Sequence, residues 1–407
     1  MTAFLSALLL QSGYNATLVA LGSALLGASA GVAGTFLFLR KRALVSDAVA
    51  HATLPGVAIA FMVMVALGGE GRSLPGLLLG SAVSAGVGLL TVEWIARRTR
   101  LPEDAAIGAV LSVFFGFGIV LLTVIQSMSS GRQAGLEGFL LGSTAGMLLV
   151  DAVLIVVGGL VSVGTIVLLR RPMTLVAFDA DFAAASGVDV RRIDLAMMGL
   201  VMAVTVIGLK IVGLILIVAL LIIPSVAARF WTDRTDRLLI AAGVIGAVSA
   251  YLGAALSASV PDVPTGPMIV LVCAGLFLAS MLLAPHRGVV AAMRRRRAFQ
   301  RRVHRRQGLL AMARGEPIHD PVTVRVLVGE GFMRPDGVAT DEGRARAARA
   351  ALDERRWGEA RRMHRDEAIG RYDGLTPIGD ALSPDEIALI DARLAGGGGA
   401  TVAGVRG

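Results

Sequence analysis

Long stretches of mostly apolar residues, separated by short polar segments, constrain this chain more than any other feature of its sequence. The hydrocarbon core of a bilayer is about 30 Å thick, and a helix needs about 20 apolar residues to cross it. Segments of about that length are residues 15–39, 48–68, 74–96, 104–127, 147–169, 194–209, 211–228, 238–258 and 265–284. We therefore predict an all-α polytopic membrane protein with about nine transmembrane helices.

The sixth and seventh of these segments form one apolar tract, from Ile193 to Phe230, that only Lys210 and several glycines interrupt. A single helix of that length would measure about 54 Å, far more than one crossing requires. The tract is therefore predicted to be two helices that turn at Gly208–Gly213.

The composition of the chain agrees with a membrane protein, because 17% of the residues are charged, whereas soluble globular proteins contain about 25% charged residues.

The basic residues that flank the segments indicate their orientation in the membrane. Of the 16 Lys and Arg residues before Pro285, 13 fall in alternate connecting segments. These are Arg40, Lys41, Arg42, Arg97, Arg98, Arg100, Arg170, Arg171, Arg191, Arg192, Arg229, Arg234 and Arg237. Cytoplasmic loops of membrane proteins carry an excess of Lys and Arg. This set of loops is therefore predicted to be cytoplasmic, with the N-terminus outside and the C-terminal tail inside.

Residues 286–395 form a second predicted domain, polar and basic, which follows a transmembrane domain of residues 1–285. From His286 onward, 23 Lys and Arg residues stand against 16 Asp and Glu residues. The arginines that open the tail are predicted to contact anionic membrane lipid; they are Arg294–Arg297, Arg301, Arg302, Arg305 and Arg306. Helical segments and a turn within Phe332–Val338 predict a small cytoplasmic α/β unit of the winged-helix type. Residues 396–407 are rich in Gly and are predicted to be disordered.

Two polar residues near the start of the second apolar segment carry the most specific chemical signal. Asp47 and His51 are four residues apart, so on a helix they lie on one face, one turn from each other. A carboxylate and an imidazole together suit a divalent cation such as Mn, Zn or Fe, and ionisable residues in membrane segments indicate function. The spacing alone equally fits an Asp that starts a helix and a neutral His that donates to a backbone carbonyl. The single cysteine, Cys273, excludes a disulfide framework and a thiolate metal cluster.

The sequence around this pair, from Ser46 to Phe61, resembles a signature of the ABC permeases that import zinc, manganese and iron. Three later segments also resemble that family: Phe178–Val188, Gly213–Ser225 and Asp262–Pro267. The resemblance extends over residues 1–285. It implies that Asp47 and His51 contact the transported divalent metal ion, and that no cofactor is bound permanently.

The same resemblance implies the location and the partners of the chain. It implies a homodimer around one central pathway in the bacterial inner (cytoplasmic) membrane. The homodimer would work with two copies of an ABC ATPase subunit and with an extracytoplasmic metal-binding protein. The chain has no Gly-x-x-x-x-Gly-Lys-Ser/Thr sequence, which is the phosphate-binding loop of such ATPases. We therefore expect a transport subunit rather than an enzyme, with ATP hydrolysis by a separate protein.

Further residues are predicted to couple ATP hydrolysis to transport and to line the pathway. Phe178 and Phe182 are four residues apart in a cytoplasmic loop, so a short helix would present both rings to a groove on a soluble partner. Asp179 belongs to the same segment, which resembles the coupling segment of the family. Pro224 frees a backbone carbonyl and kinks its helix. With Gly213, it belongs to the segment that resembles the gating helix of the family.

Other acidic residues near the ends of apolar segments have structural explanations. Asp151 begins the fifth segment, where a carboxylate complements the helix dipole. Glu93 lies one turn from Arg97, so the two are predicted to form an ion pair at the membrane interface. Glu103 and Asp104 are predicted to be ordinary first-turn acids of the fourth segment.

Two other functions fit parts of the sequence. One is a permease for an iron chelate or an organic cofactor, with a wide apolar pathway that the acid–imidazole pair does not line. The other is a membrane-tethered regulator with a DNA-binding tail, since Leu375–Ile387 diffusely resembles the winged helix of iron-dependent repressors. Ser383 and Glu386 in this stretch predict a capped helix start. A basic winged helix can bind DNA, but one joined to a membrane rarely needs to, and contact with the ATPase is favoured over DNA.

Overall fold

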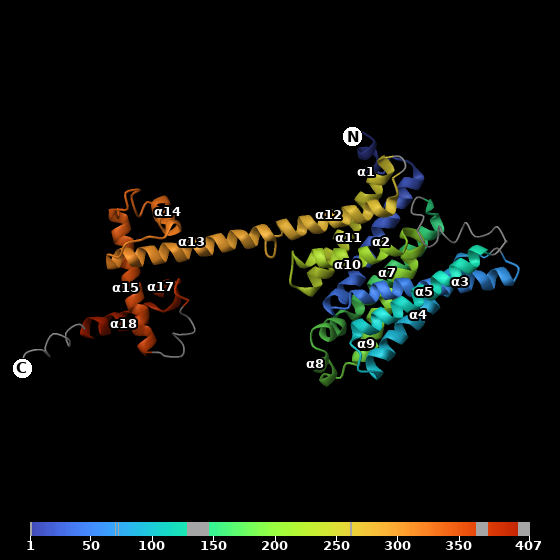
Figure 1. Ribbon diagram of the computed structural model, residues 1–407, viewed down its shortest axis with the longest axis horizontal. Coiled ribbons are helices and arrows are strands. Elements are labelled where there is room, and N and C mark those ends of the chain that lie inside the picture. The colour runs from blue at the N-terminus through green and yellow to red at the C-terminus, as the bar shows by residue number, and fades with distance from the viewer. Residues whose placement is uncertain are drawn as a thin grey trace, which may run out of the picture. The chain divides into compact units, whose positions relative to one another are not determined.

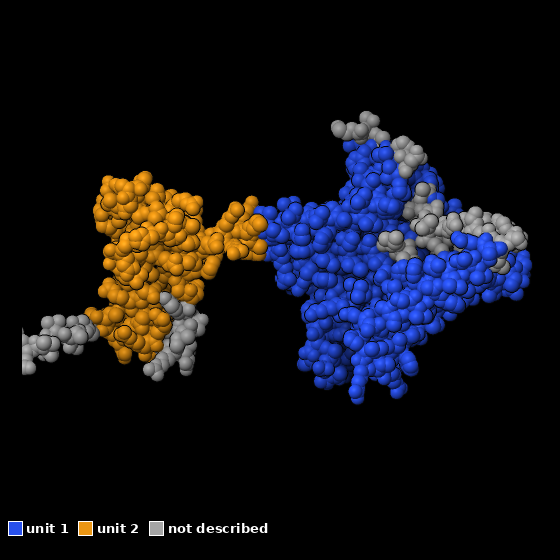
Figure 2. Space-filling model, viewed as in Figure 1, with its two compact units in different colours: residues 1–291 blue, residues 292–407 orange. Residues whose placement is uncertain are grey.

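The computed structural model describes residues 2–69, 71, 73–127, 146–260, 263–363 and 373–397, and these fold into helices joined by short turns (Figure 1). Among the described residues the only β-type pairing is an isolated antiparallel bridge between Met333 and Ala339. The chain divides into two compact units, Met1–Ala291 and Ala292–Gly407, which Figure 2 colours separately. The predicted all-α class is confirmed.

Among the described residues of the first unit, eight helices are long and apolar enough to cross a membrane. They are α2 (Tyr14–Leu39), α3 (Leu44–Ala66), α4 (Leu74–Arg98), α5 (Glu103–Ser127), α7 (Leu149–Phe178), α9 (Val190–Val212), α11 (Thr235–Ser259) and α12 (Thr265–Leu283). The short helices α1 (Thr2–Leu8) and α8 (Ala180–Ala185) complete the unit with α10 (Leu214–Arg229). The chain is therefore a multi-pass membrane protein, as predicted.

Helix α10 corrects the expected number of full spans from nine to eight in the described residues. The predicted segment 211–228 forms this helix, but its 16 residues measure only about 24 Å. The predicted turn before it is confirmed, because Gly213 ends α9 with a φ of 79°, a conformation that glycine adopts without steric cost. Ile217 and Leu221 of α10 are fully buried. The helix is therefore part of the packed interior rather than an ordinary lipid-facing span.

Ion pairs bring the predicted basic loops to one end of the helix bundle, which we call the basic end. The pairs are Arg40–Asp194 (2.9 Å), Arg42–Glu103 (2.7 Å), Arg191–Glu93 (3.6 Å), Arg170–Asp236 (3.6 Å) and Arg287–Asp233 (2.7 Å). They join the ends of α2, α4, α7 and α12 to the starts of α5, α9 and α11. Helix α9 starts at the basic end and α10 finishes there, so α9 runs away from the basic end and α10 runs back to it.

Glycines allow α2 to lie unusually close to its neighbours α10 and α11. A Cβ atom on Gly27 would lie 2.3 Å from the carbonyl oxygen of Gly246, and one on Gly31 would lie 2.4 Å from that of Ala242. On Gly34 it would lie only 1.7 Å from the carbonyl oxygen of Leu221 in α10. Small residues commonly mediate close helix packing in membranes. Helix α2 is therefore the centre about which this part of the bundle packs.

The second unit contains two small hydrophobic cores. Its helices are α13 (Val289–Arg314, which begins in the first unit), α14 (Pro321–Gly329), α15 (Asp341–Met363), α17 (Ile378–Ala381) and α18 (Pro384–Gly397). One core contains Leu309, Leu327, Phe332, Met333 and Ala347, and the other contains Trp357, Ala360, Ile378 and Ile390. Helix α15 contributes to both cores and so connects them.

The structure does not support the predicted winged-helix fold of this unit. The turn within Phe332–Val338 closes a single bridge rather than a pair of strands, so the described residues contain no wing. The predicted start of α18 is confirmed, because the Ser383 N–H donates to Glu386 Oε2 at 2.7 Å, and the Glu386 N–H donates back to Ser383 Oγ at 3.4 Å. Residues 398–407 of the Gly-rich tail lie outside the described residues.

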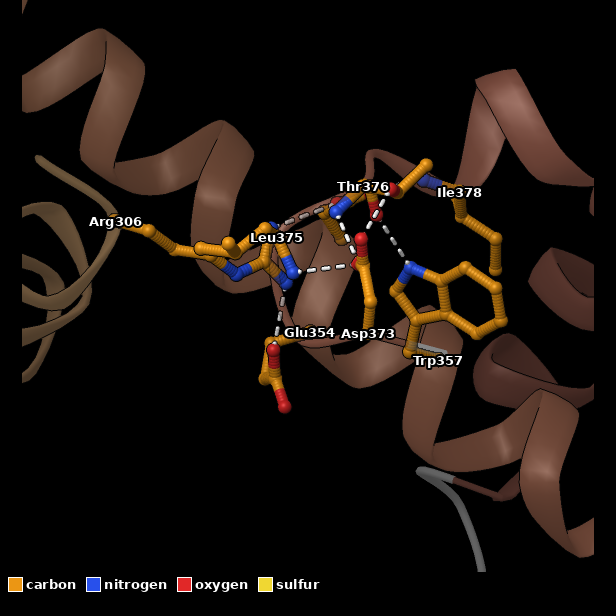
Figure 3. A network of polar contacts seen from close by, with 8 residues as sticks. Arg306, Glu354, Trp357, Asp373, Leu375, Thr376 and Ile378 are labelled. Atoms are coloured by element: carbon orange, nitrogen blue, oxygen red, sulfur yellow. Dashed lines mark hydrogen bonds and ion pairs between the residues drawn. The ribbon is translucent and has the colours of Figure 1, made fainter. Parts of the chain in front are cut away.

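A polar network beside the second core is shown in Figure 3. The Asp373 carboxylate accepts the backbone N–H of Thr376 at 2.7 Å, and the indole N–H of Trp357 donates to the Thr376 carbonyl at 3.1 Å. Arg306 of α13 donates to Glu354 of α15 at 2.7 Å. The bond from Trp357, which is completely buried, fixes the loop before α17 against α15, and the Asp373 bond holds the turn of the loop.

Protonation of Asp373 should loosen this loop. Hydrogen bonds from the backbone of Thr376, the backbone of Leu375 and the Thr376 hydroxyl lower the pKa of Asp373 to about 2. Because this folded-state pKa lies below the unfolded value of about 4, the stabilisation is present above about pH 4 and is lost as the pH falls toward 2. In full-length protein carrying Trp94→Phe and Trp231→Phe, the fluorescence of Trp357 should shift to longer wavelength over that interval.

The variant Asp373→Ala isolates this effect from the titration of other carboxylates. It should show the shifted fluorescence already at neutral pH and a smaller further change in acid. Asp336→Ala is the matched control, because Asp336 accepts the backbone N–H of Val338 at 3.1 Å in a turn outside the Trp357 core. Identical acid responses of Asp373→Ala and the unsubstituted protein would contradict the assignment.

Candidate metal site and coupling segment

Helix α3 places Asp47 and His51 on one face, as their spacing predicts. Asp47 lies in the first turn of the helix, where a carboxylate interacts favourably with the helix dipole. His51 follows one turn later, and its Nε2 lies 3.4 Å from Asp47 Oδ1. The Asp47 side chain is 38% exposed and the His51 side chain 21% exposed. An ion approaching from outside the helix can therefore reach both groups.

The surroundings of His51 test the alternative interpretation, in which the residue is a neutral His that donates to a backbone carbonyl. Its Nδ1 is buried and has no hydrogen-bond partner among the described residues. The ring instead stands edge-on to Phe115 of α5, with centroids 4.9 Å apart and an interplanar angle of 82°. The alternative required a hydrogen bond to a backbone carbonyl, and the described part of the chain supplies none. The imidazole is held by packing on α5 and faces Asp47.

The chemistry of the pair fits a borderline divalent cation but does not complete its coordination. A carboxylate oxygen and an imidazole nitrogen are ligands for Mn, Fe and Zn. Such ions usually take four or more ligands in proteins, whereas no group of three or more His, Cys, Asp and Glu side chains suited to a metal occurs in the described residues. Further ligands for an ion at this pair would be backbone or hydroxyl oxygens, water, or groups from undescribed residues or another chain.

The other acidic residues that the sequence singled out have structural roles. Asp151 is buried in the first turn of α7, where its carboxylate accepts the Leu148 N–H at 3.0 Å. Glu93 pairs with Arg97 at 2.8 Å, as predicted. Glu103 is in the first turn of α5. Because these acidic residues have structural roles, Asp47 and His51 remain the candidate metal ligands.

The predicted coupling segment is exposed at the basic end, but its two aromatic rings do not share one helix. Helix α7 ends at Phe178, and Asp179 is extended (φ −148°, ψ 94°) before α8 begins. The Asp179 carboxylate caps α8 by accepting the Phe182 N–H at 2.8 Å. The prediction of a single helical face is therefore wrong. Both rings are nevertheless largely exposed, Phe178 by 62% and Phe182 by 58%.

The predicted gating residues lie at the end of α9 and within α10. Gly213 forms the break between the two helices, and Pro224 is buried inside α10. The next residue, Ser225, donates to the carbonyl oxygens of Leu221 in α10 (3.1 Å) and Gly31 in α2 (3.0 Å). This hydroxyl links the proline-containing turn of α10 to the central helix α2.

The membrane unit matches a known family of transport proteins. Residues 14–284 correspond to the ABC 3 transport family. The chain belongs to the ABC 3 transport family. Its resemblance to metal-transporting ABC permeases is thereby confirmed, and this ABC 3 family member is a permease subunit of an ABC transporter.

The names of relatives of this ABC 3 family member state a substrate, as two of them illustrate. The manganese transport system membrane protein MntC of Bacillus subtilis (strain 168) is 42% identical over 298 residues, which are 73% of this chain and 67% of the relative. The zinc transport system membrane protein TroC of Treponema pallidum (strain Nichols) is 41% identical over 289 residues, which are 71% of this chain and 95% of the relative.

The fold also resembles a solved structure, PsaBC from Streptococcus pneumoniae in complex with Fab. The TM-score is 0.60 at 28% identity, and the match covers 70% of this chain and 98% of the other. The family match ends at residue 284. The C-terminal unit is therefore an addition to the part of the chain that the family match covers.

Proposed function

We propose that the chain is the membrane permease of an ATP-driven importer for divalent transition metal ions: manganese, zinc or iron. The observation that carries this proposal is the Asp47–His51 pair, 3.4 Å apart on α3, with no carbonyl hydrogen bond to occupy the imidazole in the described residues. The transport names of the manganese and zinc relatives support it. The metal ion is cargo, and Asp47 and His51 are its proposed ligands along the path.

A homodimer would complete the coordination of the ion. Each chain contributes one carboxylate and one imidazole, so two chains around one central pathway would offer four protein ligands. That number matches the usual minimum for such ions. The partly exposed Asp47 carboxylate fits this arrangement, because ligands supplied by a second chain require a face that the first chain leaves open.

The proposed partners follow from the two ends of the bundle. The basic end carries the excess of Arg residues and is assigned to the cytoplasm of a bacterial inner membrane, with the C-terminal unit on the same side. An ABC ATPase would bind the exposed segment at Phe178, Asp179 and Phe182, and an extracytoplasmic metal-binding protein would deliver the ion to the other end. Arg294–Arg297, all exposed on α13, would contact anionic lipid headgroups.

Uptake of a panel of metals by cells that express this chain with its ATPase and binding protein tests the function. Mn²⁺, Zn²⁺ or Fe²⁺ should accumulate, and the accumulation should disappear when the ATPase is inactivated. Transport of an iron chelate or an organic cofactor, without accumulation of any free divalent ion, would contradict the proposal.

The double substitution Phe178→Ala and Phe182→Ala should detach the ATPase without unfolding the permease. Aromatic rings that act as interface hot spots contribute more than about 1 kcal/mol each, so binding should weaken by about 10-fold or more. Co-purification of the ATPase and metal uptake should fall together. Phe117→Ala is the control, because Phe117 is 51% exposed on α5 and lies outside the coupling segment. Unchanged co-purification and uptake in the double variant would refute this role.

A further inference from the structure

A buried cluster of charged residues lies at the basic end, between the coupling segment and the start of the metal-site helix. Arg40 donates to Asp194 Oδ2 and to the carbonyl oxygen of Val176, both at 2.9 Å. Arg42 contacts Asp194 Oδ2 at 3.5 Å and pairs with Glu103 at 2.7 Å. Two arginines from the α2–α3 link thus converge on one carboxylate oxygen of α9.

The cluster is shielded from water and incompletely satisfied. The Asp194 side chain is 8% exposed, so its charge interactions are screened less than those of surface pairs. The second oxygen of Asp194, Oδ1, and the Nε of Arg40 are buried without a hydrogen-bond partner among the described residues. Buried polar atoms are normally paired. The cluster therefore retains an acceptor and a donor that a second arrangement of the same residues can use.

The positions of these residues in the chain show which parts of the protein the cluster joins. Val176 lies two residues before the end of α7, and Asp194 is the fifth residue of α9. The coupling segment, Phe178–Val188, lies between them. Arg42 lies two residues before α3 begins, and Asp47 is in the first turn of α3. Residues that flank the coupling segment on both sides are therefore bonded to the α2–α3 link, from which the metal-site helix starts.

We propose that Arg40, Arg42 and Asp194 are positioning residues that transmit movement of the coupling segment to Asp47 and His51. Coupling between sites can be carried by contiguous contacts that have more than one arrangement, and this cluster joins the flanks of the coupling segment to the link from which α3 starts. When the ATPase shifts the end of α7 and the start of α9, the α2–α3 link must follow, and it carries the start of α3 with it. This inference rests on the proposed function.

A second ion-pair group at the basic end provides a matched control. Glu93 of α4 is 11% exposed and contacts Arg97 at 2.8 Å and Arg191 of α9 at 3.6 Å. It therefore resembles Asp194 in burial, in charge and in contacting the start of α9. It differs because neither of these ion pairs involves the α2–α3 link. Loss of Glu93 should weaken the bundle without disconnecting the coupling segment from α3.

The test uses the full chain assembled with its ATPase and binding protein, with Mn²⁺ as the transported ion. Asp194→Asn removes the charge and keeps the shape of the side chain. This variant should bind Mn²⁺, co-purify with the ATPase and hydrolyse ATP like the unsubstituted protein, while Mn²⁺ uptake falls by about fivefold or more, the lower range of coupling between sites. Glu93→Gln should keep uptake within about twofold. Arg42→Gln, which removes the contact with Asp194 that lies nearest to α3 in the chain, should also lose uptake with ATP hydrolysis retained.

Three results would overturn the inference. Uptake in Asp194→Asn equal to that in Glu93→Gln would show that the cluster transmits nothing. Parallel loss of ATP hydrolysis and uptake in Asp194→Asn and Arg42→Gln would assign it a role in assembly alone. If Asp194→Asn does not accumulate in the membrane, normal uptake by Arg42→Gln overturns the inference instead. An unsubstituted complex that transports no divalent metal would contradict the proposed function itself, which separates the two failures.

Discussion

Replacing His51 by alanine should abolish metal uptake while the amount of folded protein stays close to that of the unsubstituted chain. The substitution removes one of two proposed protein ligands per chain, and even residues that only support a ligand typically change metal affinity by about 10- to 100-fold. The structural cost is smaller, because the ring loses an edge-on contact with Phe115 of about 0.5–1.5 kcal/mol. Uptake per folded protein, measured at one neutral pH, separates the two effects.

Asp47→Ala should have the same consequence, since the carboxylate is the other half of the pair. His286→Ala is the matched control, because it removes an exposed imidazole in the link after α12. That variant should transport normally. Near-normal uptake in both Asp47→Ala and His51→Ala would place the metal path elsewhere in the protein.

Gly34→Ala should strongly destabilise the membrane unit. The added Cβ atom would lie 1.7 Å from the carbonyl oxygen of Leu221, which is backbone and cannot move aside as a flexible side chain can. Overpacking of a close-packed interior typically costs about 1–3 kcal/mol. Helix α10 would have to separate from α2, which also disturbs the Ser225–Gly31 hydrogen bond. We expect a lower thermal unfolding midpoint for the purified full-length protein in detergent.

Gly275→Ala is the control for this substitution. Gly275 also lies in a membrane helix, α12, but a Cβ atom there would meet no described atom within 4 Å. Its midpoint should be unchanged or slightly raised, because alanine favours a helix more than glycine does. Equal midpoints for the two variants would mean that α2 and α10 are not packed as closely as described.

The helices of the membrane unit were predictable because length and apolarity are properties of each segment alone. The turn at Gly213 was predictable for the same reason, since the tract around it is too long for one crossing. The interior position of α10 was not predictable, because a helix packed against other helices and one packed against lipid are both apolar. The extended conformation of Asp179 was also missed. An Asp that caps the next helix can interrupt a helical pattern that residue spacing alone continues.

Local spacing also explains which part of the candidate site the sequence revealed. Asp47 and His51 are one helical turn apart, so their proximity follows from the sequence. Phe115, which holds the His51 ring, comes from a different helix, and Arg40 and Asp194 are separated by 154 residues. Only the folded bundle brings such residues together. The winged-helix prediction was not supported because a turn sequence marks a reversal of the chain without requiring strands on either side.

The central claim, that Asp47 and His51 form the metal site of this permease, is tested most directly by equilibrium binding of Mn²⁺ to the purified full-length protein. Free aqueous Mn²⁺ gives a sharp EPR spectrum that broadens on binding, so the bound fraction can be measured during a titration. We predict saturable binding of one ion for each pair of chains, which is lost in Asp47→Ala and in His51→Ala and retained in His286→Ala. Binding of equal affinity and stoichiometry in all four proteins would contradict the claim.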